Sequence, residues 1–362
     1  MPDPPRRRVA VVGATGVAGQ QFLVSLANHP WFEVTALAAS ARSAGRSYRE
    51  AITEPSGPQR WSCDEPLPPA FAERPVVDAE RLDTSELDLV FSAVGSDAAR
   101  ALEARFAAQV PVVSTASAFR YEDDVPIIVP GVNHEHAALV KRQQRERGWK
   151  GYVVPIPNCT ATGLVVALAP LVRHFGVRSV IMTSMQALSG AGRSPGVSGM
   201  DILDNVIPYI PKEEEKVQTE TAKILGRLLG DRVEPLDLPV SAHCNRVHVR
   251  DGHTECVSAG LSRPAEPAEV VEAMRSFGRD FIDLGLPSAP PELISVSDDP
   301  YRPQPRIDRQ LHDGMTTVVG RVRPDPVLLH GVKFVLLSHN TKLGAAKGAC
   351  LVAEYLVQRG LA

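Results

Sequence analysis

The first part of the chain alternates between short apolar runs, typical of buried strands, and longer stretches whose apolar residues recur at helical spacing. The runs lie at 8–12, 32–39, 87–94, 110–113 and 152–154, and the helical stretches at 20–28, 97–109 and 136–147. This alternation predicts an α/β domain with a Rossmann-type, doubly wound parallel sheet. Ligands gather at the carboxyl ends of strands in such sheets, where Gly95, Ser117 and Arg120 stand here.

The pattern changes after residue 176, where strands are grouped together. Strands are predicted at 177–188, 240–249, 254–261, 317–322 and 333–337, and helices at 212–229, 267–281 and 341–359. Asp251-Gly252 indicates a hairpin between two of these strands. Grouped strands predict an α+β domain with a mixed or antiparallel sheet. We expect a first domain at 1–157, a second at 158–338, and a C-terminal helix within 339–362 that returns to the first domain.

A cysteine stands where a strand gives way to a helix. Two prolines end the run 152–154, Asn158 and Cys159 follow, and the apolar stretch 163–171 reads as a buried helix. A helix N-terminus stabilises an anion, so a cysteine there has a lowered pKa and more of the nucleophilic thiolate. The N–H groups and the Asn158 amide are also suited to hold an oxyanion. The alternative is a small buried residue heading a core helix.

A glycine-rich turn follows the first strand and opens the first helix. Its spacing is G-x-x-G-x-x-G over 13–19, which lets the backbone approach a pyrophosphate at the helix N-terminus. At the end of the second strand, where an NAD enzyme carries an acidic residue, this chain has Ser40, Arg42 and Ser43. Arginine and serine suit a 2′-phosphate, so the sequence favours NADP(H). The predicted turn contacts are Gly13, Thr15, Gly16, Val17 and Ala18.

Composition and charge exclude several classes of protein. Of 362 residues 44% are hydrophobic and 22% charged, and the net charge is −3, which does not suggest nucleic acid. No apolar run approaches the length of a membrane span, and residues 1–8 contain no apolar signal core. Five scattered cysteines do not form a disulfide framework, so we expect a reduced, cytoplasmic protein.

Motifs in order along nearly the whole chain resemble those of the aspartate-semialdehyde dehydrogenases of archaea and fungi. The matching stretches are Gly13–Gly16, the Ser40/Arg42/Ser43 loop, Ser117–Arg120, Pro157–Cys159, Met185–Ala187, Ser189–Gly192, Asp201–Ile210, Glu213–Lys216, Ser241–Arg246, Asp251–Glu255, Arg302–Arg306 and Ser338–Thr341. Two positions depart from the family pattern. Thr115 stands where many members have Asn, and Gly131 where many have Glu.

The resemblance implies a role for each matching residue. Cys159 would be the nucleophile and His253 its acid/base partner, with Asn158 and Gln186 orienting the thioester. The residues that would bind the substrate are Arg246 at its carboxylate, Glu213 at its ammonium group, and Arg120 and Lys216 at its phosphate. Ser189, Gly190 and Asn340 would join the cofactor site. Glu213 and Lys216 also fit a plain surface pair, and His253 a solvated hairpin residue.

The implied reaction is the NADPH-dependent conversion of L-4-aspartyl phosphate to L-aspartate 4-semialdehyde and phosphate through a thioester on Cys159. A cleft between the two domains would hold the site. The apolar, non-basic segment 201–210 would help to form a homodimer or homotetramer through a catalytic and dimerisation domain.

Three other interpretations stay open at this point. A related acyl reductase, such as a malonyl-CoA reductase, would share the thioester but not the ammonium site. A catalytically silent paralogue would bind NADP without using Cys159. The histidines and cysteines at 243–256 invite a zinc site, since the His243 to His248 spacing suits a ligand pair. Five residues along a strand place those two on opposite faces, so we expect no metal.

Overall fold

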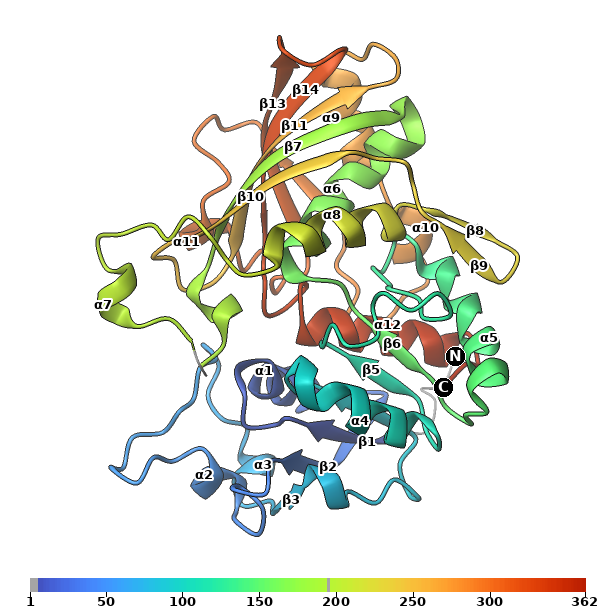
Figure 1. The fold of residues 1–362 in the computed structure, drawn as a ribbon. Helices are drawn as coiled ribbons and strands as arrows, with labels where there is room; N and C mark the ends of the chain where they lie inside the picture. Colours follow the sequence, from blue (N-terminus) through green and yellow to red (C-terminus); the bar gives the residue numbers. More distant parts are fainter. Residues whose placement is uncertain (1–5, 194–195) are drawn as a thin grey trace. The chain divides into compact units, whose positions relative to one another are not determined.

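The computed structural model describes residues 6–193 and 196–362, which form two compact units (Figure 1). The first unit contains the chain up to Pro126, then His136–Ile156 and Ala345–Ala362; the second contains Ile127–Glu135 and Pro157–Gly344. These boundaries differ from the expected ones because 127–135, Pro157 and 339–344 belong to the second unit. Ile127, Val129 and Val132 are buried in its core, which explains the first difference. Residues 1–5, which belong to the N-terminal stretch 1–8 that was expected to contain no signal peptide, lie outside the described ranges.

The first unit is built on a six-stranded sheet whose neighbouring strands are all parallel. The strands, in spatial order, are β3 (Val76–Asp78), β2 (Phe32–Ala39), β1 (Arg7–Val12), β4 (Leu89–Ser92), β5 (Val112–Ser114) and β6 (Val153–Pro155). The helices are α1 (Val17–Leu26), α2 (Tyr48–Ala51), α3 (Pro69–Ala72), α4 (Ser96–Ala107), α5 (Leu139–Arg147) and α12 (Ala346–Gln358), with a 3-10 turn η1 at Ala79–Arg81. The doubly wound parallel sheet predicted from the alternating pattern is confirmed.

The second unit contains a mixed six-stranded sheet. The strands, in spatial order, are β10 (Val240–Arg246), β7 (Val177–Gln186), β11 (His253–Leu261), β14 (Gly331–Ser338), β13 (Thr317–Asp325) and β12 (Ile294–Ser297), and β8 (Arg227–Leu229) pairs with β9 (Arg232–Glu234) apart from them. The helices are α6 (Cys159–Phe175), α7 (Gly199–Ile202), α8 (Glu213–Ile224), α9 (Pro267–Arg275), α10 (Arg279–Ile282) and α11 (Pro305–Asp308), and the 3-10 turns are η2 (His134–Ala138), which straddles the boundary, and η3 (Leu188–Ala191). The predicted mixed sheet is confirmed.

The predicted hairpin at Asp251-Gly252 is wrong. β7 lies between β10 and β11, parallel to the first and antiparallel to the second. The Asp-Gly turn therefore leads from one strand to another that is not its neighbour. Ladder hydrogen bonds to the long β7 replace the local pairing that turn chemistry suggested.

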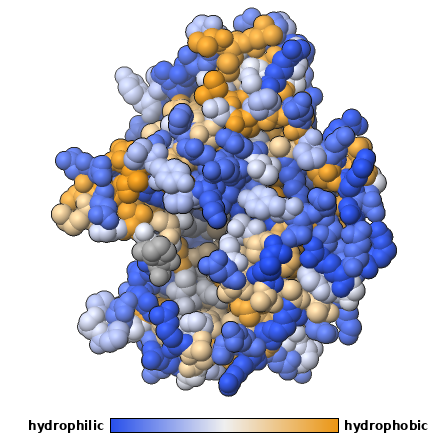
Figure 2. All heavy atoms as spheres, in the orientation of Figure 1, coloured by the Kyte–Doolittle hydropathy of each residue, from blue (hydrophilic) through white to orange (hydrophobic). Residues whose placement is uncertain are grey.

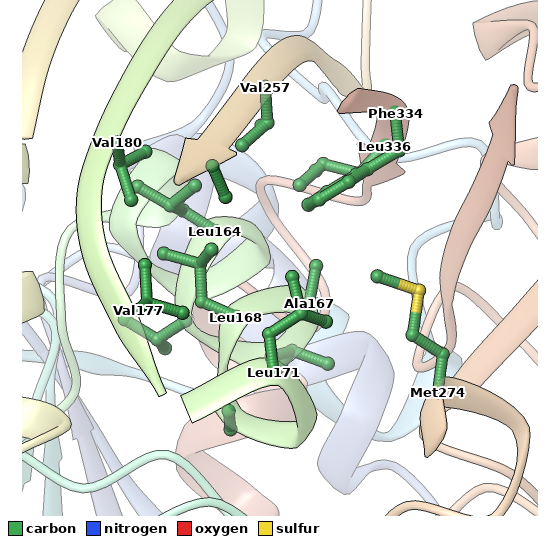
Figure 3. Close-up of a cluster of buried hydrophobic side chains, with 14 of the residues drawn as sticks. Leu164, Ala167, Leu168, Leu171, Val177, Val180, Val257, Met274, Phe334 and Leu336 are labelled. Carbon is green, nitrogen blue, oxygen red and sulfur yellow. The ribbon is translucent and has the colours of Figure 1, made fainter. Parts of the chain in front are cut away.

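The core of the second unit forms where α6 packs on the sheet. Leu164, Leu168 and Leu171 repeat at helical spacing and are fully buried, and Figure 3 shows them close to β7, β11 and β14 residues such as Val180. Burial of each such leucine is worth about 1.5–3 kcal/mol. This packing holds the helix whose first residue is Cys159.

Several predicted element ends shift in the structure. α6 starts at Cys159 instead of 163, and α12 starts at Ala346 instead of 341. α4 starts at Ser96 instead of 97, with Gly95 as its N-cap. The helix expected over 212–229 ends at Ile224, because a two-stranded hairpin follows. No helix in the described ranges is both long and apolar enough to cross a bilayer.

Candidate active site

Asn158 caps the helix that begins with Cys159. Its side-chain oxygen accepts the backbone N–H groups of Thr160 at 2.9 Å and Ala161 at 3.1 Å. Capping satisfies two of the helix's free donors and fixes the direction in which the chain enters α6. Cys159, at the first helical position, is half-buried and lies at the positive end of the helix dipole.

His253, the first residue of β11, faces Cys159. Its Nε2 lies 3.1 Å from the Cys159 Sγ, although the two residues are 94 positions apart. Its Nδ1 accepts the backbone N–H of Ala187 at 3.0 Å. A ring nitrogen that accepts a hydrogen bond carries no proton, so the neutral ring bears its proton on Nε2, which points at sulfur.

The surroundings of His253 keep the imidazole uncharged. Burial, with the positive charge of Arg246 and the nearby His339, lowers its pKa to about 3. An imidazolium would also lose the Ala187 hydrogen bond, because its Nδ1 would be a donor. Cys159 and His253 therefore form a pair in which a neutral N–H donates to sulfur.

Arg246 and Gln186 lie in the same cross-strand row as His253. Arg246 ends β10, Gln186 ends β7, and the two are register partners. Arg246 is buried and donates to the carbonyl of Ala187 at 2.6 Å, and Gln186 donates to the Ser184 hydroxyl at 3.2 Å. Burial lowers the pKa of Arg246, but the guanidinium stays charged.

Gly190 lies directly against this row. A Cβ on it would come within 3.1 Å of both the Arg246 Nη1 and the His253 Cε1. A side chain at this position would push Arg246 or His253 aside by a few tenths of an ångström, so the close approach favours glycine.

Two carboxylates of α8 reach the start of α6. Glu213, at the first position of α8, accepts the Asn158 side-chain amide and lies 3.4 Å from the Lys216 ammonium. Glu220 accepts the Asn158 backbone N–H at 2.6 Å. Glu213 is buried, so the surface-pair interpretation does not hold for it. The Asn158 amide is occupied by Glu213 and the helix cap, and its expected contact with the thioester stays a prediction.

Asn340 joins two loops of the second unit. Its side-chain nitrogen donates to the Ser189 hydroxyl at 2.7 Å, and its oxygen accepts the Gly252 N–H at 2.8 Å. The structure thus gathers ten predicted site residues in this unit. They are Asn158, Cys159, Gln186, Ser189, Gly190, Glu213, Lys216, Arg246, His253 and Asn340.

The other predicted residues lie in the first unit. Those of the glycine turn, Gly13, Thr15, Gly16, Val17 and Ala18, connect β1 to α1 or begin α1, and Ser40, Arg42 and Ser43 follow β2. The N-cap of α1 is Gly16, which makes no side-chain capping bond. Within the described ranges Arg42 is exposed and makes no ion pair. An uncapped helix end and a cation without a carboxylate partner suit a dinucleotide phosphate and a 2′-phosphate.

Arg120 is buried at the end of a loop that follows β5. It donates to the carbonyl of Thr115 at 2.8 Å. Thr115, a departure from the family pattern, keeps this carbonyl in place with its own N–H, 2.9 Å from the Ser92 oxygen. Gly131, the other departure, has φ of +78° and its Cβ would strike Leu293, so this backbone favours glycine over glutamate.

The described residues contain no cluster of three or more histidine, cysteine or acidic side chains that would hold a metal. Burial raises the pKa of Cys244, one of the residues considered for zinc, to about 12. This thiol therefore stays protonated and unreactive.

Two family models cover most of the chain. Residues 8–140 match the semialdehyde dehydrogenase NAD binding domain, and residues 168–343 match the semialdehyde dehydrogenase dimerisation domain. Over 96% of this chain and 98% of the relative, the sequence is 43% identical to an aspartate-semialdehyde dehydrogenase of Methanothermobacter thermautotrophicus.

The chain belongs to the aspartate-semialdehyde dehydrogenase family. A crystal structure of the family's enzyme from Candida albicans with NADP has a TM-score of 0.88 and 41% identity, covering 98% of this chain and 100% of that one. Aspartate-semialdehyde dehydrogenase II of Vibrio cholerae complexed with ASA has a TM-score of 0.77 and 25% identity, covering 98% and 99%. The resemblance inferred from the motifs is confirmed.

The sequence interpretation missed two buried carboxylates that hydrogen-bond to predicted site residues or to strand ends. Glu220 holds the Asn158 backbone, and Glu103 of α4 binds two strand-end hydroxyls. A signal was present for Glu220, because it shares the buried face of α8 with Glu213, Val217 and Ile224. An acidic residue at a core position of an amphipathic helix is buried only where polar partners satisfy it, so such a position indicates a candidate site residue.

Proposed function

We propose that the protein reduces L-4-aspartyl phosphate to L-aspartate 4-semialdehyde with NADPH, and runs the reverse reaction with phosphate. The 3.1 Å contact between the Cys159 Sγ and the His253 Nε2, at the N-terminus of a buried helix, carries the proposal. The thiolate is the form that attacks carbonyl carbon. The helix dipole and the Nε2–H donor both favour it.

The substrate groups are assigned to the charged side chains of the site. Arg246 presents a planar guanidinium suited to the α-carboxylate, and Glu213 a carboxylate suited to the α-ammonium. Lys216 in the second unit and Arg120 in the first each carry a positive charge suited to phosphate. A malonyl-CoA reductase would have no ammonium group for the buried Glu213, so the carboxylate supports the amino-acid substrate.

NADP(H) is assigned as the cofactor, and bound NADP⁺ supplies the hydride acceptor. The uncapped N-terminus of α1 would receive the pyrophosphate, and Arg42 with Ser40 and Ser43 would receive the 2′-phosphate. In the second unit, the Ser189–Asn340 pair and Gly190 would border the nicotinamide.

In the direction of acyl phosphate formation, the Cys159 thiolate adds to the aldehyde carbon. A C–S bond forms and the carbonyl pair moves to oxygen. The Nε2–H of His253 donates to this oxygen, and hydride leaves the carbon, so that a thioester remains. A phosphate oxygen then attacks the thioester carbon, the C–S bond breaks, and its pair returns to sulfur. The lowered pKa of His253 favours the neutral ring as a hydrogen-bond donor at this step, and its expected acid/base role toward Cys159 stays a prediction.

We also propose that the second unit forms a homodimer, alone or within a tetramer. An apolar arm over 199–210 exposes Met200, Leu203, Val206 and Tyr209, and Figure 2 shows orange atoms on the surface where α7 lies. Ile207 on this arm exchanges two backbone hydrogen bonds with Arg246, at 3.0 and 2.8 Å. A second copy that covers the arm would therefore stabilise the backbone of a substrate residue.

The test is a covalent adduct. Brief exposure to L-aspartate 4-semialdehyde and NADP⁺ without phosphate should leave an acyl mass on the Cys159 peptide, and added phosphate should remove it. Cys159→Ala should abolish turnover while NADP binding survives. A Cys244→Ala variant is the matched control and should keep full adduct formation. Normal turnover with no acyl mass on Cys159 would refute the mechanism, and so would malonate semialdehyde with CoA serving as the better substrate pair.

A further inference from the structure

Glu103 is a fully buried carboxylate in the first unit for which the proposed mechanism has no use. It lies on α4, and its Oε1 accepts the hydroxyls of Ser92 at 2.7 Å and Ser114 at 2.5 Å. These serines are the last residues of β4 and β5, and they are register partners. One carboxylate oxygen therefore joins two neighbouring strand ends, which is the edge where ligands bind in such sheets.

The serine hydroxyls connect Glu103 to the loop that carries Arg120. The Ser114 hydroxyl, while donating to Glu103, accepts the N–H of Ala116 at 2.9 Å. The turn it fixes contains Thr115, whose carbonyl accepts the Arg120 guanidinium at 2.8 Å. A continuous chain of hydrogen bonds thus runs from Glu103 through Ser114 and this turn to Arg120.

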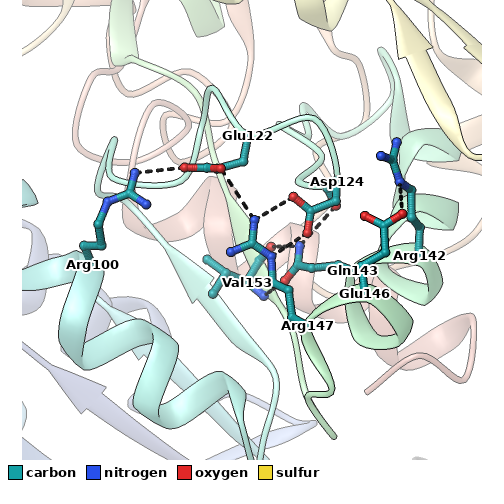
Figure 4. A network of polar contacts seen from close by, with 8 residues as sticks. All are labelled: Arg100, Glu122, Asp124, Arg142, Gln143, Glu146, Arg147 and Val153. Carbon is teal, nitrogen blue, oxygen red and sulfur yellow. Dashed lines mark hydrogen bonds and ion pairs between the residues drawn. The ribbon is translucent and has the colours of Figure 1, made fainter.

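The same face of α4 holds the rest of that loop. Ser96, Arg100 and Glu103 are spaced at i, i+4 and i+7, so they form one stripe. The Ser96 hydroxyl lies 2.9 Å from that of Ser117. Arg100 donates to the carbonyl of Ala118 and lies 3.0 Å from Glu122, as Figure 4 shows for the ion pair.

Glu122 extends this attachment away from α4. It lies 3.7 Å from Arg147, which is paired in turn with Asp124, so both flanks of the loop are fixed (Figure 4). The stripe therefore holds the loop from its first turn to its far end. Of its three side chains, Glu103 is the buried one and the one linked to the Arg120 turn.

We propose that Glu103 is a positioning residue for the Arg120 anion site, acting through the Ser92 and Ser114 hydroxyls. This inference rests on the proposed function, which assigns phosphate to Arg120. A carboxylate binds a hydroxyl donor about twice as strongly as a neutral acceptor does. An amide in its place would loosen the turn and leave Arg120 less ordered when phosphate binds. The residues that bind NADP and the aldehyde would be unaffected.

Protonation of Glu103 would loosen the turn in the same way as replacing the carboxylate with a glutamine amide. Burial raises the pKa of Glu103 to about 7. The hydrogen bonds from the two hydroxyls and the positive charge of Arg120 act in the opposite direction and limit this rise. The strands packed against α4 (β4, β5 and β6) contribute no titratable side chain. The positive charge that lowers the pKa of this carboxyl is that of Arg120. The carboxylate form, and with it the tighter turn, is present above pH 7.

The experiment compares Glu103→Gln with Asp97→Asn, which makes the same charge change on an exposed position of α4. Phosphate is varied at saturating aldehyde and NADP⁺. At pH 8 Glu103→Gln should raise the KM for phosphate about tenfold, with kcat and the other KM values within about twofold. Because phosphate itself ionises near neutrality, the phosphate KM of Glu103→Gln is divided by that of the wild type at each pH. This ratio of KM values should fall toward one at pH 6.

Ser114→Ala removes the hydroxyl that joins Glu103 to the turn, so it tests the same interaction from the other side. It should raise the KM for phosphate in the same way, and the double variant should be no worse than either single one, because the two side chains act as one unit. Equal phosphate KM values in Glu103→Gln, Ser114→Ala and Asp97→Asn would overturn the inference, as would a ratio that does not change with pH. A wild-type enzyme without phosphate-dependent NADP⁺ reduction would instead refute the proposed function.

Discussion

Glu255 gives a quantitative prediction for stability. It is the residue two positions after His253 on the same face of β11, it is fully buried, and within the described ranges neither carboxylate oxygen has a hydrogen-bond partner. Burial raises its pKa well above the usual value. The folded protein therefore holds a neutral carboxylic acid here, whereas the unfolded chain ionises in the ordinary acidic range.

The sign of the pH effect follows from this difference. Folding takes up a proton at Glu255, so its contribution is fully favourable below the unfolded pKa and is lost as pH rises toward the folded pKa. Each pH unit in that window costs about 1.4 kcal/mol. Glu255→Gln has no proton to bind, so its stability relative to wild type should improve as pH rises from 5.5 to 7.5, by at most about 1.4 kcal/mol per pH unit.

The assay is urea unfolding of wild type and Glu255→Gln at pH 5.5, 6.5 and 7.5 and one protein concentration. Glu272→Gln makes the same change at an exposed position of α9 and should show no such trend. A difference between Glu255→Gln and wild type that stays constant with pH would show that the carboxyl ionises in the folded protein, and the reasoning would fail.

Three further changes test the site. Arg42→Ala should reduce the preference for NADP over NAD, measured as the ratio of kcat/KM values, about tenfold or more, because a charge-assisted contact is worth about 1.5–3 kcal/mol; equal use of both cofactors by the wild type would contradict this. Gly190→Ala should lower kcat about tenfold or more, since its Cβ would lie 3.1 Å from Arg246 and His253. An unchanged kcat would show that these two side chains do not need their present places. Arg246→Lys should raise the KM for the aldehyde about tenfold or more through loss of the planar fork; an unchanged KM would remove Arg246 from the carboxylate site.

Much of the fold was readable from local patterns. Strand β2 has the predicted bounds, and the glycine turn lies between a strand and a helix as expected. The helix expected over 163–171 is present, and it begins earlier, at Cys159, because Asn158 caps it. These features depend on residues within a few positions of each other, which is the range over which periodicity, capping and turn chemistry act.

The tertiary structure decided what the local patterns left open. The sequence alone predicted a hairpin between β10 and β11, but β7 pairs with both, because a strand's neighbour depends on ladder bonds to distant segments. The Cys159–His253 contact and the Ala187 N–H that sets the histidine tautomer likewise join residues far apart in sequence. The burial of Glu103 follows from the packing of α4 on two strand ends. Such side chains acquire their chemistry only when folding removes water from them, so no local pattern reports it.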